Sequence, residues 1–217
     1  MVPLALIDAV AAAALLAIWY FCLARYNRRK GAAAMRWMEV ACLGQGRIIE
    51  AKWLGASRLQ AKMAFAAHWI EGARVTVRLR PRSVPVQWIL SIWRKQKETL
   101  TFEADLDCAP GFQLQVYRHR WLTHKHVNLG SRSKQWAVSR PGPVVLTTRT
   151  QWAQELTPVV NTLMTSRGHN LMSVRLRPES PHLTATVALE ALSDGEAASS
   201  FLSVVRELAA GASTSRQ

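Results

Sequence analysis

The chain has 217 residues, of which 49% are hydrophobic and 19% are charged, and its 28 Lys and Arg against 14 Asp and Glu give a formal charge of +14. This composition excludes a disordered polyelectrolyte and a protein that crosses a membrane many times. The three cysteines, Cys22, Cys42 and Cys108, are too widely spaced for a disulfide framework, which indicates a reducing compartment.

The first predicted element is a membrane-spanning helix. The uncharged apolar run at 9–24, extended by residues 4–7, reaches the roughly 20 residues needed to cross a hydrocarbon core of about 30 Å. Trp19 and Tyr20 stand where an aromatic belt is expected. Four basic residues follow: Arg25, Arg28, Arg29 and Lys30. By the positive-inside rule, residues 1–30 form a signal anchor and basic stop region in the cell membrane, with the N-terminus outside and the remainder cytoplasmic.

Three other interpretations of this segment are weaker. A cleaved signal peptide carries its positive charges before the apolar run, whereas here they follow it. Lipid attachment at Cys22 calls for small residues before the cysteine, but Trp19, Tyr20 and Phe21 precede it. A buried core helix of this length is the third alternative.

Residues 31–211 are predicted to form a cytosolic domain, and residues 212–217 a disordered tail. Residues 31–44 fit either a continuation of the helix or a first strand. Period-two alternation then predicts strands at 47–53, 58–65 and 73–80, the first with Ile49, Ala51 and Trp53 on one face. Ser83 is expected to cap a short helix over 84–96.

The second half of the chain continues the same pattern. Strands at 98–107 and 112–121 are predicted to form a hairpin in which Leu106 pairs with Leu114. After an irregular stretch at 122–147 come a helix from about 150 to 167, strands at 171–177 and 182–189, and a last helix over roughly 194–210. The predicted fold is α+β: a single N-terminal transmembrane helix followed by a mainly antiparallel sheet with helices packed on one face.

Positive charge is concentrated in two stretches of the predicted domain, 51–97 and 108–154, and the second has seven Lys or Arg and no acid. Between Ala51 and Lys97 there are ten Lys or Arg and a single acid, Glu71. Arginines that alternate along neighbouring strands form a cationic face, and each basic residue near an anionic leaflet contributes about 1 kcal/mol. A solvated strand face with counterions is the alternative. The residues predicted to bind lipid or another polyanion are Arg28, Arg29, Lys30, Arg58, Lys62, Arg74, Arg78, Arg80, Arg94 and Lys95.

The same face would suit other polyanions. An acidic protein partner is an open alternative to the lipid bilayer, whereas a nucleic acid is not favoured because no recognised nucleic-acid-binding motif is present. The segment 84–97 is apolar nearly all round and then basic. Packing of this segment between the sheet and its neighbours is favoured over insertion of Trp88 and Trp93 into the headgroup zone.

Catalytic chemistry has little support in the sequence. Glu103, Asp105 and Asp107 share a strand face and could hold a cation, but cross-strand ion pairs with the excess arginine are favoured. His124 and His126 have no third metal ligand at a recognisable spacing. Motifs for nucleophilic catalysis and for nucleotide cofactors are absent. We therefore assign no catalytic residue, metal, cofactor or small-molecule ligand.

The sequence predicts a single-pass protein whose basic cytosolic domain is a non-enzymatic binding or scaffolding module at the anionic inner membrane surface. The alternatives are a membrane-tethered binder of nucleic acid or another polyanion, or an enzyme with no recognisable motif.

Overall fold

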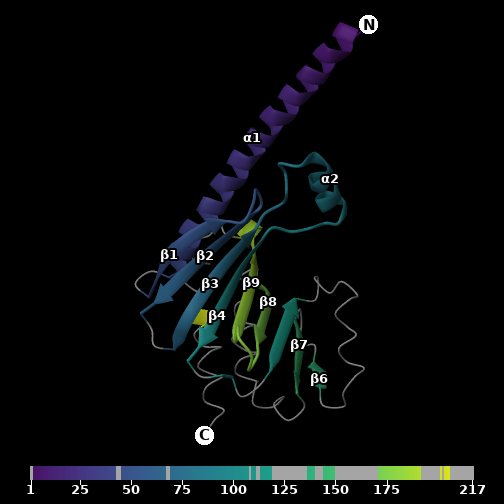
Figure 1. Ribbon diagram of the computed structural model, residues 1–217. Coiled ribbons are helices and arrows are strands. Elements are labelled where there is room, and N and C mark those ends of the chain that lie inside the picture. Colours follow the sequence, from purple (N-terminus) through teal and green to yellow (C-terminus); the bar gives the residue numbers. More distant parts are fainter. Residues whose placement is uncertain are drawn as a thin grey trace.

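In the computed structural model the described residues are 2–42, 45–66, 69–107, 109–110, 113–118, 136–139, 144–149, 171–191, 201 and 203–205. A long helix enters an antiparallel sheet, so the fold is α+β as predicted (Figure 1). The predicted helix at 150–167, His124, His126, the tail at 212–217 and most of the predicted last helix at 194–210 lie outside the described residues.

Helix α1 (Val2–Ala41) is a single helix of 40 residues, about 60 Å long. It resolves the ambiguity at 31–44 in favour of a helix that continues to Ala41. Its N-terminal half projects away from the sheet, whereas its C-terminal half lies against it (Figure 1). Residues 5–41 contain one stretch long and apolar enough to cross a membrane, and none of its most apolar window is buried.

Within the described residues the sheet has nine strands in the order β1-β2-β3-β4-β9-β8-β5-β7-β6, and each of these pairs is antiparallel. The bounds are β1 Gly46–Trp53, β2 Arg58–Phe65, β3 Ile70–Arg78, β4 Thr99–Leu106, β5 Leu114–Arg118, β6 Trp136–Ser139, β7 Val144–Arg149, β8 Leu171–Leu176 and β9 Leu183–Ala188. Helix α2 (Pro85–Trp93) connects β3 to β4, and the short 3-10 turn η5 (Leu189–Ala191) follows β9.

One face of the sheet forms the core and the other is polar. Alternate residues of β2, β3 and β4, such as Leu59, Val75 and Phe102, are buried on the inner face. The C-terminal half of α1 covers this face with Met38 and its neighbours, and Phe201 from the helical residues near the C-terminus packs against Phe102. Such alternation is expected for an antiparallel sheet with one solvated face.

The predicted hairpin between the strands at 98–107 and 112–121 is wrong. Strand β4 pairs with β3 and β9, and β5 pairs with β7 and β8, so Leu114 lies opposite Leu176 and Thr148 instead of Leu106. Period-two patterning fixes which face a residue occupies, but it does not choose among partners that satisfy the same parity.

A register shift between Ile48 and Glu50 corrects the predicted face of β1. Ile48 packs against the core, whereas Ile49 is 63% exposed. An extra residue in one strand reverses the alternation beyond it, so Trp53 still faces the core while Ile49 does not.

The predictions for α2 need two corrections. Its N-cap residue is Val84, with no side-chain capping hydrogen bond, so Ser83 is not the cap. The helix also does not pack between the sheet and its neighbours, because Ser91 is its one buried residue and Trp93 is 83% exposed. The inner face of the sheet is already covered by α1 and the helical residues around Phe201, which leaves α2 outside the core.

Candidate functional site

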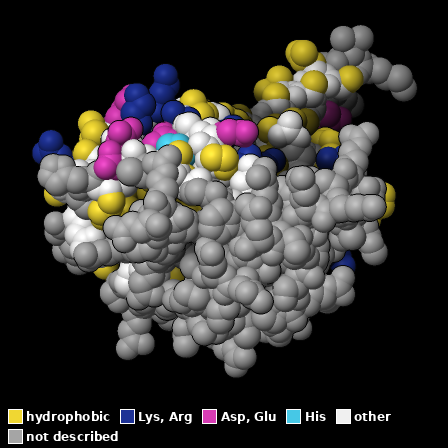
Figure 2. All heavy atoms as spheres, turned by 90° about the horizontal axis from the view of Figure 1, so that it is seen from below, with side chains coloured by type: hydrophobic (Ala, Val, Ile, Leu, Met, Phe, Trp, Pro, Cys, Tyr) yellow, Lys and Arg dark blue, Asp and Glu magenta, His cyan; other side chains and the backbone are white. Residues whose placement is uncertain are grey.

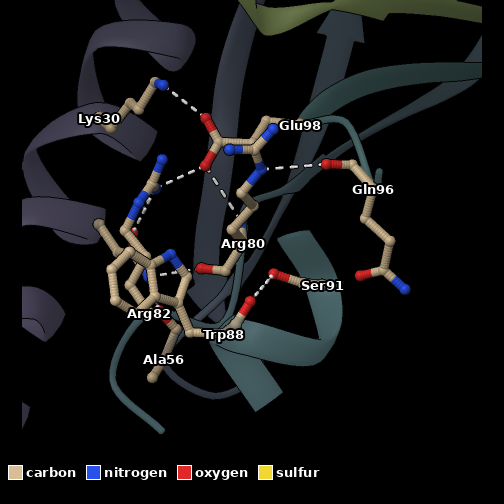
Figure 3. A network of polar contacts seen from close by, with 9 residues as sticks. Lys30, Ala56, Arg80, Arg82, Trp88, Ser91, Gln96 and Glu98 are labelled. Atoms are coloured by element: carbon tan, nitrogen blue, oxygen red, sulfur yellow. Dashed lines mark hydrogen bonds and ion pairs between the residues drawn. The ribbon is translucent and has the colours of Figure 1, made fainter. Parts of the chain in front are cut away.

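The junction between α1 and the sheet is built around a buried carboxylate. Glu98 is 4% exposed and lies just before β4. Its carboxylate forms an ion pair with Lys30 of α1, in which Nζ lies 2.5 Å from Oε2. On its other oxygen, Oε1, it accepts hydrogen bonds from Arg82 Nη1 at 2.5 Å and from the backbone N–H of Arg80 at 3.1 Å. These contacts come from two segments, α1 and the loop that follows β3 (Figure 3). They attach the helix to the sheet.

Asn27, which is fully buried on α1, extends the same network. Its amide nitrogen donates to the carbonyl oxygens of Ala56 and Arg80, each at 3.1 Å, and its amide oxygen accepts from Arg82 at 3.2 Å. The Arg82 guanidinium also lies over the Tyr26 ring, 5.0 Å from its centroid. Buried polar groups of this kind need partners, and here the partners come from the β1–β2 turn and from the loop after β3.

The electrostatics of the junction hold Glu98 ionised. Burial by itself raises the pKa of this carboxyl, but hydrogen bonds from Lys30, the Arg80 amide and Arg82, together with the Arg82 charge, bring the pKa below its usual value. The opposite case is Cys42, at the end of α1, where burial raises the pKa of the thiol to about 12. Both effects belong to the packing of α1 on the sheet, so this part of the junction is structural.

A second part of the junction is apolar and exposed. The indoles of Trp19 on α1 and Trp88 on α2 lie 5.6 Å apart between centroids, and Trp19 Nε1 donates to the carbonyl oxygen of Arg82 at 3.2 Å. Helix α2 is thereby held beside the projecting half of α1. Helix α2 and its N-cap residue expose a set of large apolar side chains: Val84, Val86, Ile89, Leu90, Ile92 and Trp93.

Basic residues follow this apolar helix directly. Arg94 ends α2, and Lys95 adopts a left-handed conformation with φ of 49° that turns the chain toward β4. Both side chains are exposed. The exposed surface therefore changes within two residues from large apolar side chains to positive charge.

A groove of about 670 Å³ lies between α1 and the turn joining β1 to β2. Tyr20, Phe21, Arg25 and Arg28 line it from the helix, and Trp53 lines it from the strand. Gly31 lets the two walls meet, since a Cβ there would come within 2.7 Å of the Trp53 ring. Along α1 the lining changes from the aromatic Tyr20 and Phe21 to the basic Arg25 and Arg28, and the Trp53 ring adds an aromatic side chain beside the basic end.

The outer face of the sheet carries the alternating arginines. Lys62 and Arg74 lie opposite each other on β2 and β3, and each also has an acidic neighbour on its other side. Glu103 lies opposite Arg74 on β4, and Glu50 of β1 forms an ion pair with Lys62 at 3.3 Å. Figure 2 shows basic and acidic side chains intermixed on the described part of this surface. Arg58 faces Arg78, and the next residue across is Thr99, so positive charge accumulates at that end of the strands.

The predicted basic residues thus fall into five places. Lys30 and Arg80 belong to the junction, where Arg80 Nε also donates to the Gln96 carbonyl oxygen at 3.0 Å. Arg28 lines the groove and Arg29 is exposed on α1. The outer face of the sheet holds Arg58, Lys62, Arg74 and Arg78, and the end of α2 holds Arg94 and Lys95.

The three acids predicted on one strand face do not assemble a metal centre in the structure. Glu103 lies across from Arg74, and Asp105 accepts a hydrogen bond from Ser180 Oγ at 2.7 Å. A shallow hollow of about 420 Å³ beside them also contains Lys62 and Arg74. Within the described ranges, no three His, Cys, Asp or Glu side chains are grouped as metal ligands.

Comparison with known proteins identified no relative of this chain. Neither the protein-family models nor the curated proteins give a match to the sequence.

Sequence reasoning missed the residues that hold the junction together. Asn27 and Glu98 stand within short basic stretches and belong to no recognisable motif, and their partners lie up to 68 positions away along the chain. The available signal was local: Asn27 and Lys30 are one turn apart on the half of α1 that enters the domain.

Proposed function

We propose that this protein is a single-pass membrane protein whose cytosolic α+β domain acts as a non-enzymatic binding or scaffolding module at the anionic inner membrane surface. The observation that carries the proposal is the apolar surface of α2, which is left uncovered beside the apolar half of α1. An uncovered apolar helix at this position has the bilayer as its natural environment.

The dimensions of α1 support this arrangement. Residues 4–23 span about 30 Å, the thickness of a hydrocarbon core. Trp19 then lies within about 6 Å of the cytosolic edge, at the depth that tryptophan prefers. Because α2 packs on Trp19, its exposed side chains reach the same depth.

Charge supports the same orientation. Arg25, Arg28 and Arg29 follow the apolar stretch of α1, and Arg94 and Lys95 follow α2, so two basic clusters adjoin two apolar surfaces. Each basic residue near an anionic leaflet contributes on the order of 1 kcal/mol, screened over a Debye length of about 8 Å. The domain would then lie against the leaflet with α2 at the boundary between the hydrocarbon core and the headgroups.

The position of α2 can be tested in the full chain reconstituted into nanodiscs. An environment-sensitive dye is attached at W93C after Cys22, Cys42 and Cys108 have been replaced, and quenching by spin-labelled lipids is measured in neutral and anionic discs. The control is a dye at I49C, on the outer face of β1. We expect strong quenching at position 93, greater in anionic discs, and little at position 49. A dye at 93 that stays in water in both compositions overturns the proposal.

Two further measurements separate the alternatives. Protease added to intact cells should leave the domain uncut if it is cytosolic, and digestion of the domain would reverse the proposed topology. An oligonucleotide that binds the reconstituted protein tightly, together with a dye at position 93 that ignores lipid charge, would favour the polyanion binder instead.

A further inference from the structure

We propose that the groove between α1 and the β1–β2 turn binds one anionic phospholipid of the cytosolic leaflet. This inference rests on the proposed function for its orientation in the membrane, and it assigns a ligand class to the groove.

The polarity of the groove follows the polarity of a phospholipid. Tyr20 and Phe21 line one end, Ala24 the middle, and Arg25 and Arg28 the other end. Between Phe21 and Arg28 the helix rises about 10 Å, which is comparable to the depth of an interfacial region. An acyl chain would run along Phe21 toward the bilayer, and a phosphate would lie between the two guanidinium groups.

The two arginines suit a phosphate in both number and spacing. Arg25 and Arg28 are three residues apart, so they are neighbours on one face of α1. Both side chains are exposed. Among the described residues, no carboxylate forms an ion pair with either. Guanidinium groups bind phosphate oxygens through charge-assisted, often bidentate hydrogen bonds, and they are the preferred side chains for this ligand.

The opposite wall is held in place by the buried network. Asn27, on the same helix, donates a hydrogen bond to the carbonyl oxygen of Ala56, and the Trp53 ring lies directly against Gly31. Both Ala56 and Trp53 line the groove. The groove therefore has its shape before a ligand enters, which lowers the cost of binding.

The volume and the apolar end favour a lipid over a free phosphate. At about 670 Å³ the groove exceeds the needs of a phosphate ion, and Phe21 would gain nothing from a soluble anion. Phe21 also belongs to the exposed apolar surface of α1, so a bound chain would remain continuous with the bilayer.

The test is native mass spectrometry of the full chain in detergent with phosphatidylglycerol or phosphatidylcholine added. We expect one phosphatidylglycerol to be retained, with a preference of about tenfold or more over phosphatidylcholine. The double variant R25Q/R28Q should lose this preference. The matched control is R29Q/R36Q, which removes the same charge from exposed positions of α1 that do not line the groove.

A second variant tests the cavity itself without changing charge. A24F places a large side chain in the middle of the groove and should reduce retention of phosphatidylglycerol about tenfold. Competition with inorganic phosphate and with glycerol phosphate shows whether the headgroup alone is sufficient; we expect neither to displace the lipid at millimolar concentration.

Equal retention of the two lipids, or equal losses in R25Q/R28Q and R29Q/R36Q, overturns the inference, as does displacement by inorganic phosphate. Because the measurement is made in detergent, it does not depend on α2 reaching a leaflet. If lipid retention fails while the dye at position 93 is quenched, the groove is wrong and the proposed function stands; the reverse result rejects the proposed function alone.

Discussion

The indole rings of Trp19 and Trp88 lie 5.6 Å apart, although 69 residues separate them in the sequence. Their planes are inclined at 55°, and Trp19 is also hydrogen-bonded to the backbone at Arg82. This single contact fixes where an exposed apolar helix sits along α1. Under the proposed function, it therefore determines which part of the domain faces the bilayer together with the apolar half of α1.

Substitution of either tryptophan should loosen α2. Tilted aromatic pairs contribute about 0.5–1.5 kcal/mol beyond the area they bury, so we expect a double-mutant cycle of W19A and W88A to give a coupling of about 1 kcal/mol. Amide hydrogen exchange of α2 in detergent micelles measures it. W93A is the control, because that side chain is 83% exposed and should leave exchange unchanged. Strictly additive effects of the two variants would contradict the pairing.

The variant E98Q should destabilise the domain by about 3 kcal/mol, because it leaves two cations at a partly buried site without a neutralising charge. A glutamine also presents an NH₂ donor to one of the two cations. The lowered midpoint of thermal unfolding, followed by tryptophan fluorescence, reports the loss. E50Q provides the comparison: the Glu50–Lys62 pair is more than half exposed on both sides, and its loss should cost less than about 1 kcal/mol. Similar losses in the two variants would show that Glu98 does not hold the junction.

The lowered pKa of Glu98 also predicts how the stability of the domain depends on pH. Its pKa is lowered in the folded protein, so its contribution to stability is complete above the ordinary glutamate pKa of about 4.3 and is lost as the pH falls through the lower folded value. The difference in unfolding free energy between wild type and E98Q should therefore be constant from pH 7 to about 5 and shrink at lower pH. Denaturant titrations across this range test it, and a difference that grows in acid has the wrong sign.

Cys42 should be unreactive in the folded state. With its pKa raised to about 12 and its side chain fully buried, it is a protonated thiol at neutral pH, whereas the thiolate is the form that alkylating agents attack. Mass spectrometry after iodoacetamide treatment at pH 8 should find Cys42 unmodified until denaturant is added. Modification at equal rates with and without denaturant would show that the end of α1 is not packed on the sheet.

The sequence predicted which residues of a strand face the core, but it did not predict which strands pair with each other. Period-two patterns located β2, β3, β8 and β9 closely, because a half-buried strand must alternate. The pairing of β4 and β5 was wrong, since strands distant in sequence satisfied parity as well as the adjacent strand did.

The candidate site was harder to predict for a related reason. Helix α2 has only two polar residues, Gln87 and Ser91, and Ser91 is the one that is buried, so its pattern did not separate packing on the sheet from exposure beside α1. Glu98 and Asn27 became informative only when the fold brought their partners together. The basic residues were easily found, yet their sequence positions did not show that Lys30 forms an ion pair with a buried carboxylate.

The unbroken path of α1 has a mechanical consequence. A domain joined to its anchor by a flexible linker explores a hemisphere of positions, whereas here the same helix carries both Trp19 and the core residue Met38. The sheet is therefore joined rigidly to α1, and in the proposed membrane arrangement any tilt that bilayer thickness imposes on α1 rotates the whole sheet by the same angle.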